Sequence, residues 1–371
     1  MFLHKLLLKD FRLFSQKIFE FQNQITVFVA SNAGGKSTVV ESIHLLATGK
    51  SFRASKVDEM VALDAEIAQI KAKIIPDIEL LNETQDLGVI DETQLAILLT
   101  RGLVNGKRTQ RQHFSVNDNK RRKKDFVGNL LVVVFRPEDM RLIEGSPSRR
   151  RDYLDLALSQ VNQEYVQSLQ QYEKTLKRRN RLLFQVREGT QPHQALTYWN
   201  MSLIKHGKKI QESRKSFAEF VNVTVESSLS FKFKYLPSVI TEKRLLERSD
   251  AEIAAGFSLI GPHKDDFEVQ FLLNEGLDNN NELRSLNAYG SRGQKRMGVL
   301  WLKKAELAFL KQESGLSPIL LLDDILSELD EANRKRVLEL VDGEQTIITT
   351  ADNSLINEIK DRLKSAQVVN L

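Results

Sequence analysis

The residues best suited to chemistry form a short glycine-rich run between two apolar segments. The run Ala30–Thr38 follows the apolar residues Ile25–Val29 and precedes a segment with apolar residues at helical spacing. In a strand, loop and helix of this kind, the backbone N–H groups of the loop converge on phosphate oxygens. The sequence therefore predicts a nucleotide phosphate-binding loop, and the alternative is a glycine-rich turn that holds no ligand.

The spacing is that of a Walker A loop, in which the Lys36 ammonium should reach the outer phosphates and the Ser37 hydroxyl should ligate Mg²⁺. Ala30 stands in place of the first glycine, which is acceptable if its φ is negative. Ala33 also stands where glycine is common, so a left-handed backbone there would be strained. The residues expected to hold the nucleotide are Ala30, Ser31, Asn32, Ala33, Gly34, Gly35, Lys36, Ser37 and Thr38.

Two adjacent carboxylates could complete this site. Asp323 and Asp324 follow the run Ile319–Leu322, which is too continuously apolar for an edge strand and favours a buried parallel one. Because ligands bind at the carboxyl ends of such strands, Asp323 can reach the Mg²⁺ that Ser37 holds, and Asp324 would face the attacking water. Taken singly, each Asp is also a common carboxylate near a turn. Lys36, Asp323 and Asp324 are thus the candidate catalytic residues, and Ser37 and Asp323 are the candidate metal ligands.

A second anion site is predicted at Ser291, where small and polar residues open a helix that runs through Phe309. Unpaired N–H groups and the helix dipole favour a phosphate at such an end. The alternative is an ordinary N-cap, a position that serine also favours.

The elements that must position these residues begin with two short strands, Leu3–Leu8 and Lys17–Phe21, joined by a polar turn near Ser15 and Gln16. They should pair as an antiparallel edge. Between them, Arg12 would lie close to the nucleotide end of the sheet, or it is a solvated turn residue.

Residues 65–135 alternate as strands do and predict a mostly antiparallel sheet layer. Asn105-Gly106 is a strong signal for a hairpin turn of the mirror type. Two basic clusters, Lys107–Arg111 and Lys120–Lys124, are either solvated loop faces or a patch that contacts DNA phosphates. The expected strands are Ala65–Ile74, Leu95–Val104, His113–Val116 and Leu130–Phe135.

A long antiparallel helical hairpin is predicted after Gly145–Ser148. Apolar residues recur at spacings of three, four or seven up to Leu183, stop at Gly189–Pro192 and resume from Leu196. Each arm of about 35 residues would span about 50 Å. We expect the apolar stripe to serve packing within the chain and the outer face to be basic. Its basic residues are Lys174, Lys177, Arg178, Arg179 and Arg181.

Strand patterning returns at Phe231–Leu236 and Phe267–Leu273. Between these strands, Asp265 and Asp266 could hold a metal or act as a base, or they only form a turn. The Asn-rich stretch Asn274–Glu282 has the composition of the least ordered segment.

The composition fits a globular protein of two domains, or of one domain with an insertion. The chain has 371 residues, of which 28% are charged and 41% hydrophobic, with a net charge of +5, no cysteine and six scattered histidines. The lack of cysteine excludes disulfides and thiolate zinc sites, so nucleotide-bound Mg²⁺ is the expected metal. The sequence has no long apolar run and its start is soon interrupted by charge, so we expect a cytoplasmic protein without a membrane span.

Together these motifs resemble the ATP-binding-cassette (ABC) heads of chromosome-maintenance, SMC-like ATPases, and within that group the RecF family of bacterial recombinational repair proteins. The resemblance covers nearly the whole chain. It is carried by Phe11-Arg12, Thr48–Arg53, Phe135–Asp139, Gly145–Ser148, Gly261–Asp266, Ser291–Gln294, Leu322–Asp324, Ser327–Asp330 and Thr346–Thr350.

The resemblance implies an α/β fold, namely an ABC-type P-loop ATPase head of a mixed sheet plus an antiparallel β layer, with an inserted antiparallel helical-hairpin arm. The head would comprise residues 1–148 and 231–371, and the arm residues 149–230.

The resemblance also implies a site shared between two subunits, in which ATP holds an ATP-dependent homodimer together. Ser291, Gly293 and Gln294 of one subunit would face the Walker residues of the other. Asp330 would lie in the loop that crosses the dimer interface, and Thr350 stands where transporter-type relatives place a switch histidine.

The function implied is sequence-independent binding of single- and double-stranded DNA at gaps, with RecR and RecO as partners in loading RecA and in replication restart. A weak DNA-stimulated ATPase activity is expected, because Asp324 is one methylene shorter than the glutamate of most transporters. Two alternatives are an ABC subunit that drives a membrane transporter and a DNA-binding scaffold whose ATP site is impaired by Ala30 and Ala33. Transporter subunits lack a long helical hairpin, which favours the first interpretation.

Overall fold

The computed structural model describes residues 1–76, 92–224, 230–272, 283–339, 341, 343–352, 355–356, 359 and 366–371. The chain divides into two compact units, one of Met1–Asp139 with Glu306–Leu371 and one of Met140–Ala305. The division into a head and an arm at residues 148 and 230 stays a prediction.

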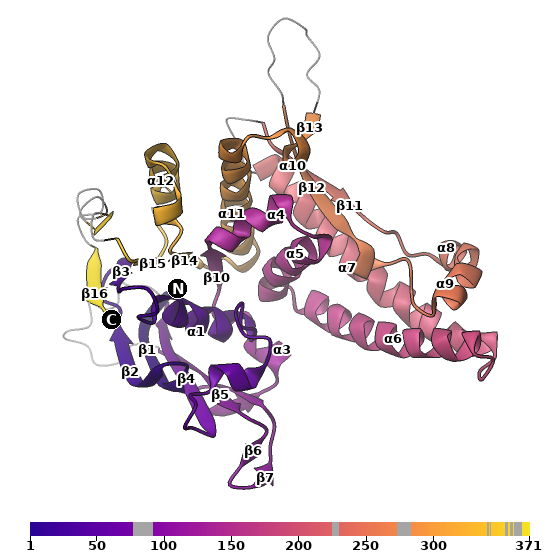
Figure 1. The fold of residues 1–371 in the computed structure, drawn as a ribbon, viewed down its shortest axis with the longest axis horizontal. Helices are drawn as coiled ribbons and strands as arrows, with labels where there is room; N and C mark the ends of the chain where they lie inside the picture. Colours follow the sequence, from indigo (N-terminus) through magenta and orange to yellow (C-terminus); the bar gives the residue numbers. More distant parts are fainter. Residues whose placement is uncertain are drawn as a thin grey trace, which may run out of the picture. The chain divides into compact units, whose positions relative to one another are not determined.

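An antiparallel sheet forms one layer of the first unit, with the strand order β2-β1-β4-β5-β8-β9. Figure 1 labels its strands β1, β2, β4 and β5. The predicted antiparallel edge is confirmed, because β1 pairs with β2. The turn between them lies at Arg12 and Leu13 and not near Ser15 and Gln16, since Phe11 pairs directly with Phe14. The strands are β1 Phe2–Phe11, β2 Phe14–Glu20, β4 Ile67–Ile75, β5 Thr93–Thr100, β8 Gln112–Val116 and β9 Asn119–Arg121.

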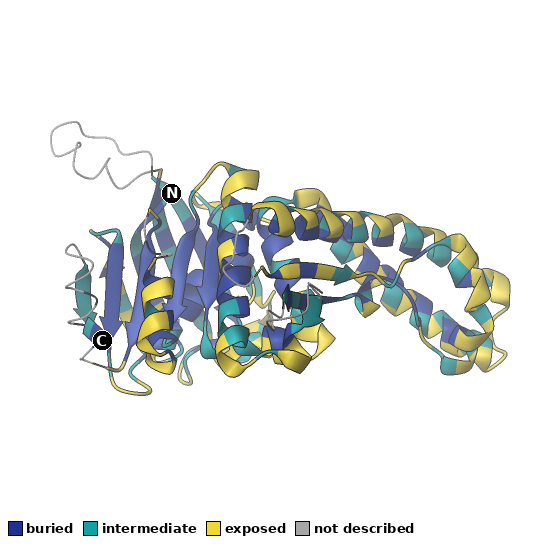
Figure 2. Ribbon diagram, turned by 90° about the horizontal axis from the view of Figure 1, so that it is seen from above, coloured by how far each residue is buried: buried dark blue, intermediate teal, exposed yellow. Residues whose placement is uncertain are grey.

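A parallel sheet forms a second layer of this unit, with the order β10-β14-β15-β3-β16. Every residue of β3, β10, β14 and β15 is buried, as Figure 2 shows in blue. The buried parallel strand predicted before Asp323 and Asp324 is confirmed. The strands are β3 Ile25–Val29, β10 Val132–Phe135, β14 Ile319–Asp323, β15 Thr346–Thr350 and β16 Gln367–Asn370.

One predicted strand belongs to the other sheet. Leu130–Phe135 was expected in the antiparallel layer, but β10 pairs in parallel with β14. The reason is visible in its composition, because a continuous apolar run suits a strand that is buried on both faces.

Helix α1, Lys36–Thr48, contacts β4 and β5 of the antiparallel sheet and β10, β14 and β15 of the parallel sheet. Its end is set by Gly49, which has a φ of 63° and whose N–H donates to the Leu45 carbonyl at 2.8 Å. Side chains of both sheets and of α1 form one hydrophobic core. The phosphate-loop helix is thus fixed between two layers.

The remaining elements of the first unit are short. Asn105 and Gly106 have φ values of 48° and 72°, which confirms the predicted mirror-type turn. Asn117 and Asp118 form a second turn with positive φ that was not predicted. The elements are η1 Val57–Met60, β6 Leu103–Val104, β7 Lys107–Arg108, α3 Lys123–Phe126, η2 Pro137–Met140, η5 Leu326–Glu328 and α12 Glu331–Leu338.

The second unit contains the predicted helical hairpin, made by α6, Gln163–Arg187, and α7, Thr197–Thr224. The two helices run antiparallel, since Arg179 bonds Asn200 and Arg214 bonds Tyr165. At 25 and 28 residues they are shorter than expected. The apolar spacing continues through Asn162, but the Asn162 side chain accepts from the Tyr165 N–H and starts a new helix.

A three-stranded antiparallel sheet of order β11-β12-β13 contacts α7 through β11 in the second unit. The strands predicted at Phe231–Leu236 and Phe267–Leu273 are confirmed in β11 and β12, while Asn274–Glu282 lies outside the described residues. The elements are α4 Arg141–Glu144, α5 Pro147–Val161, η3 His193–Leu196, β11 Lys232–Leu236, α8 Glu242–Glu247, α9 Ser249–Ala255, η4 Pro262–Lys264, β12 Asp266–Leu272, β13 Leu283–Ser285, α10 Leu286–Tyr289 and α11 Arg292–Ser314.

One basic residue of the hairpin does not lie on its outer face. Arg179 is only 2% exposed and donates to Asn200, Ser258 and the buried Glu252. Its position on α6 carries it inward toward the segment that follows α9. The other four predicted residues, Lys174, Lys177, Arg178 and Arg181, are exposed.

Asp265 and Asp266 are structural carboxylates. Asp265 is fully buried and accepts hydrogen bonds from Arg214, Tyr235 and the Ser238 N–H. Asp266 pairs with Arg150. Both carboxylates are therefore committed within the chain, and among the described residues no cluster of three or more His, Cys, Asp or Glu side chains suits a metal ion.

Within the ranges that the structure describes, no helix combines the length and the apolar character needed to cross a membrane.

Candidate nucleotide-binding site

The loop between β3 and α1 is tightly folded around its glycines. A Cβ atom at Gly34 would lie 2.6 Å from the Ala30 Cβ, and one at Gly35 would lie 2.7 Å from Cζ of Phe14. Gly35 also has a φ of 99°. No larger residue fits at these two positions, so the loop has the close backbone cradle that a phosphate needs.

The two alanines of the loop behave differently. The φ of Ala30 is not positive, so alanine is acceptable there. Ala33 has a φ of 68°, which is the left-handed conformation that was expected to be strained. A left-handed alanine costs about 1–2 kcal/mol relative to a right-handed one. The backbone of the phosphate loop is therefore strained at Ala33.

Lys36 is buried in the loop with its ammonium group facing both the loop backbone and an acid. Its Nζ donates to the Ala30 carbonyl at 2.7 Å and lies 3.7 Å from Oδ2 of Asp324. The side chain is 5% exposed. The cation is thus held at the mouth of the loop, where the outer phosphates of a nucleotide are expected.

Asp323 lies at the carboxyl end of β14 and accepts two hydroxyl hydrogen bonds on Oδ1, from Ser37 at 3.1 Å and from Thr349 at 2.9 Å. Burial raises the pKa of Asp323, and the two hydrogen bonds offset part of that effect. A cation beside this carboxylate would relieve the cost of its burial. The oxygen donors of Asp323 and Ser37 are those that Mg²⁺ prefers, so these residues fit the ion.

Asp324 has a φ of 56°, although it is not a glycine. Its N–H donates to Oγ1 of Thr349 at 3.0 Å, and its side chain is 35% exposed. Strained backbone of this kind is found at functional sites, where the surrounding structure holds it. The arrangement leaves the Asp324 carboxylate accessible next to the Lys36 ammonium.

Thr349 was not predicted, although its hydroxyl donates to the Asp323 carboxylate and accepts from the Asp324 backbone N–H. The available signal was its place at the end of a parallel strand, since ligands gather at that edge of the sheet. The next residue, Thr350, is 1% exposed, and its carbonyl accepts from the Ala30 N–H at 3.4 Å. Thr350 thus contacts the start of the loop through its backbone, while its hydroxyl accepts from the Asp352 N–H.

Arg12 is not a solvated turn residue. Its Nε and Nη2 donate to the two carboxylate oxygens of Glu41 at 3.0 and 2.7 Å. Glu41 is fully buried on α1 and also accepts from Ser51 Oγ at 2.5 Å. This network ties the β1–β2 turn and the segment after α1 to the phosphate-loop helix. Glu41 was also missed, although a lone acid in an apolar helix pattern was the available signal.

Ser291, Gly293 and Gln294 lie in the second unit, at the start of α11. The Gln294 N–H donates to Ser291 Oγ at 3.3 Å, and the Ser291 N–H donates to Gln294 Oε1 at 2.8 Å. This reciprocal pair is a capping box, so within one chain the start of α11 has the geometry of an ordinary N-cap. A Cβ at Gly293 would meet nothing within 4 Å, and Ser291 and Gly293 are exposed. The helix start is open to a partner.

The two basic clusters of the first unit are mostly exposed. Arg111 pairs with Asp58, Arg122 pairs with Asp125, and Lys123 donates to the Gly49 carbonyl. The remaining basic side chains of the clusters are Lys107, Arg108, Lys120, Arg121 and Lys124.

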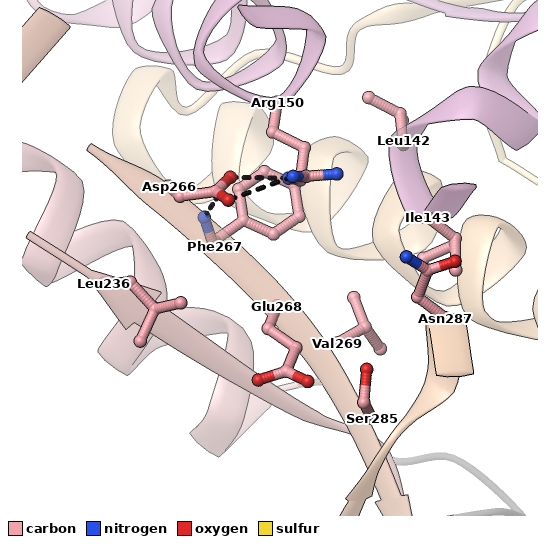
Figure 3. A pocket seen from close by; sticks show the side chains of 10 residues that line it. All are labelled: Leu142, Ile143, Arg150, Leu236, Asp266, Phe267, Glu268, Val269, Ser285 and Asn287. Carbon is pink, nitrogen blue, oxygen red and sulfur yellow. Dashed lines mark hydrogen bonds and ion pairs between the residues drawn. The ribbon is translucent and has the colours of Figure 1, made fainter. Parts of the chain in front are cut away.

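A small pocket of about 200 Å³ lies within the second unit (Figure 3). Arg150 crosses one side and donates to both oxygens of Asp266, at 2.5 and 2.9 Å. Glu268, Ser285 and Asn287 add polar groups to the lining. None of the residues expected to hold the nucleotide lines this pocket, although Asp266 does. The pocket is therefore separate from the candidate nucleotide site.

Comparisons with known proteins agree on one family. The family model described as "RecF/RecN/SMC N terminal domain" matches residues 2–370. Proteins named "DNA replication and repair protein RecF" are similar, at 33% identity in Thermoanaerobacter sp. (strain X514), with 94% of each chain covered, and at 32% in Herpetosiphon aurantiacus, with 95% of this chain and 94% of that protein covered.

The fold agrees with that similarity. The solved structure of the recombination mediator protein RecF with ATPrS, in the RecFOR pathway, is 30% identical with a TM-score of 0.81, and 95% of this chain and 93% of that chain are covered. A second solved structure, RecF-ATP, has a TM-score of 0.80 at the same identity, covering 95% of this chain and 92% of that chain. The fold is therefore the ABC-type ATPase head that the sequence predicted. The chain belongs to the RecF family.

Proposed function

We propose that the chain is an ATP-dependent DNA-binding protein of DNA replication and recombinational repair, in which ATP joins two copies of the chain. One observation carries the proposal: Lys36, Ser37 and Asp323 meet beside a tight glycine loop at the carboxyl end of a parallel sheet. Similar proteins named for DNA replication and repair, and a similar protein solved with ATP, support the same conclusion.

The residues of the loop each have a task in this proposal. The backbone from Ala30 to Thr38 holds the phosphates, and the Lys36 ammonium neutralises their charge. Ser37 and Asp323 would hold Mg²⁺, which when bound stabilises charge on the phosphate oxygens. Asp324 would orient the attacking water and take up its proton at a carboxylate oxygen.

The start of α11 would supply the other half of the site from a second copy. Ser291, Gly293 and Gln294 are exposed or half-buried, and Gly293 has open space around it. A helix N-terminus with these small and polar residues suits a phosphate. In one chain the two capping N–H groups are satisfied by each other's side chains. Binding across the interface would therefore compete with the capping box. Thr350 would sense the nucleotide from the end of β15.

DNA would be bound through its phosphates without sequence preference. Exposed basic side chains in Lys107–Arg111 and Lys120–Lys124 support this, because Lys and Arg contacts to phosphate carry no sequence information. RecR and RecO are the proposed protein partners, and loading of RecA at gaps and replication restart are the proposed outcome. We place this work in the cytoplasm, where the DNA substrate lies.

Equilibrium binding tests the proposal. Lys36→Ala should weaken ATP binding strongly, and ATP should tighten DNA binding by the native chain but not by the variant. DNA affinity should fall steeply with salt. Affinity for DNA that ignores both ATP and salt would contradict the proposal. If Lys36→Ala binds ATP as the native chain does, the scaffold with an impaired site is the better account, which the strained Ala33 supports.

We also expect slow hydrolysis. Asp324 is shorter than glutamate, and its left-handed backbone fixes the direction of its side chain, so it is less able to adjust to the water. Single-turnover measurements with ATP should give a weak rate that DNA increases. A rate comparable to that of fast ABC transporters would contradict this prediction and favour the transporter alternative.

A further inference from the structure

We infer that the end of the helical hairpin carries a separate surface for single-stranded DNA, where bases stack on Phe184 and Phe257. We call it the arm-tip surface; it consists of Lys177, Arg181, Phe184, Arg187, Phe257 and Lys264. The inference deepens the proposed DNA-binding function and rests on it.

Two aromatic rings are exposed at this place. Phe184 is 50% exposed on α6, and Phe257 is 45% exposed in the segment after α9. A Cβ at Gly256 would lie 3.8 Å from Cδ2 of Phe184, so this segment runs directly past the Phe184 ring. Adjoining exposed apolar side chains of this kind are typical of interaction sites.

The segment is held firmly to the helix. The Ser258 N–H donates to Oδ1 of Asn180 at 2.9 Å, and Nη1 of Arg179 donates to Ser258 Oγ at 2.7 Å. Arg179 also pairs with Glu252, whose carboxylate is fully buried. The backbone next to Phe257 is therefore held to α6, beside Phe184.

One cation lies over each ring. The Arg187 guanidinium lies 4.7 Å from the Phe184 ring centroid, and Nζ of Lys264 lies 5.7 Å from the Phe257 ring centroid. Lys177 and Arg181 precede Phe184 by seven and three residues on α6 and so share its face. Both are exposed, with no ion pair to any residue that the structure describes.

Acidic side chains also lie near the surface. Glu188 is bonded to Arg187 at 3.0 Å, Glu173 lies further along α6, and the exposed Asp250 lies on α9, which packs against α6. The six residues of the arm-tip surface themselves include four cations and no acid. Rings flanked by cations are the arrangement that binds single-stranded nucleic acid, because every base has a flat face to stack and a phosphate to neutralise. In a duplex the bases are stacked on each other, so this surface should prefer a single strand.

The test uses the full chain with three probes, namely a short oligothymidylate, an abasic oligonucleotide of the same length, and a blunt duplex. The double variant Phe184→Ala/Phe257→Ala should weaken oligothymidylate binding by about tenfold or more, because each stacked base adds substantially to affinity. Its affinity for the abasic strand and for the duplex should stay unchanged. Fluorescence anisotropy measures all three, and circular dichroism checks that the variant is folded.

Two further variants serve as controls. Tyr198→Ala removes an aromatic side chain that is 70% exposed on α7 and lies outside the arm-tip surface, so it should not change oligothymidylate binding. Lys177→Ala/Arg181→Ala should weaken both single strands, and it should lower the salt dependence by about 0.7 per charge removed.

The outcomes separate this inference from the proposed function. If the double Phe variant binds oligothymidylate like the native chain, or loses affinity for the abasic strand equally, the arm-tip surface is overturned while duplex binding still supports the proposed function. If the native chain binds none of the three probes, with or without ATP, the proposed function itself fails.

Discussion

At the scale of single residues, the two alanines of the phosphate loop provide a matched pair. Ala33 has a φ of 68°, whereas the φ of Ala30 is not positive. Ala33→Gly should keep or raise the free energy of unfolding, by up to about 1 kcal/mol, because glycine removes the left-handed strain. Ala30→Gly should lower it by about 0.5–1 kcal/mol, because glycine only adds freedom to the unfolded chain. Urea unfolding measures both, and a larger loss for Ala33→Gly than for Ala30→Gly would contradict the account.

His263 gives a prediction for pH. Burial lowers the pKa of His263, and the nearby Lys264 and Arg151 add to the effect. Its Nε2 donates to the Ser258 carbonyl, and in the neutral ring its Nδ1 accepts from the Tyr172 hydroxyl. Between the lowered pKa and the ordinary value of 6.5, the unfolded chain binds more protons than the folded one. This contribution to stability is therefore complete above pH 6.5 and is lost as the pH falls through the lowered pKa.

His263→Gln should make the thermal unfolding midpoint less sensitive to pH across this acidic range, because glutamine can keep both hydrogen bonds without titrating. Some dependence should remain, since burial also lowers the pKa of His206. An unchanged pH dependence in His263→Gln would show that the buried imidazole does not contribute.

The sequence predicted the residues whose chemistry follows from a short motif. Ser37 contacts Asp323 and Lys36 contacts Asp324, because the loop and the strand end each have a local signature. Thr349 and Glu41 were not found, because their roles depend on partners that only the fold brings close. We expected a left-handed Ala33 to be strained but did not predict that it is left-handed, since the φ of Ala33 is set by the whole loop.

At the scale of elements, a buried polar network joins α5, α7 and the turn before β12. Arg214 on α7 is 2% exposed and donates to Asp155 at 2.7 Å and to Asp265 at 2.8 Å. Arg214→Met should lower the free energy of unfolding by about 3–5 kcal/mol, because it leaves the buried carboxylate of Asp265 and the half-buried carboxylate of Asp155 without their cation. Urea unfolding followed by circular dichroism checks this.

The neighbouring residue is the control for that variant. Lys215 is exposed and pairs with Glu219 at 3.7 Å, so Lys215→Met should change stability by less than about 0.5–1 kcal/mol. Equal losses for the two variants would mean that the network does not hold the hairpin.

The elements were predicted well where one pattern decides the structure, as in β14 and the antiparallel edge. Two errors arose where a second local signal was not weighed. The strand at Leu130–Phe135 was placed in the antiparallel sheet, although its continuous apolar run suits a parallel strand that is buried on both faces. The break at Asn162 was missed because the apolar spacing continues through it, although asparagine is a favoured N-cap residue.

At the scale of the whole molecule, we propose that the phosphate loop forms half of a nucleotide site and that a second copy of the chain supplies the other half. Lys36, Ser37, Asp323 and Asp324 lie in the first unit, whereas Ser291 opens a helix in the second. A shared site makes a specific prediction for mixtures. Two chains that are each defective in a different half should together form one intact site.

Sedimentation velocity with ATP and Mg²⁺ tests this most directly, on the native chain, on Lys36→Ala, on Ser291→Arg and on an equimolar mixture of the two variants. We predict that the native chain forms dimers, that each variant alone stays monomeric, and that the mixture forms dimers, because Lys36 of the Ser291→Arg chain meets Ser291 of the Lys36→Ala chain. A mixture that stays as monomeric as its components, while the native chain dimerises, would contradict the shared site.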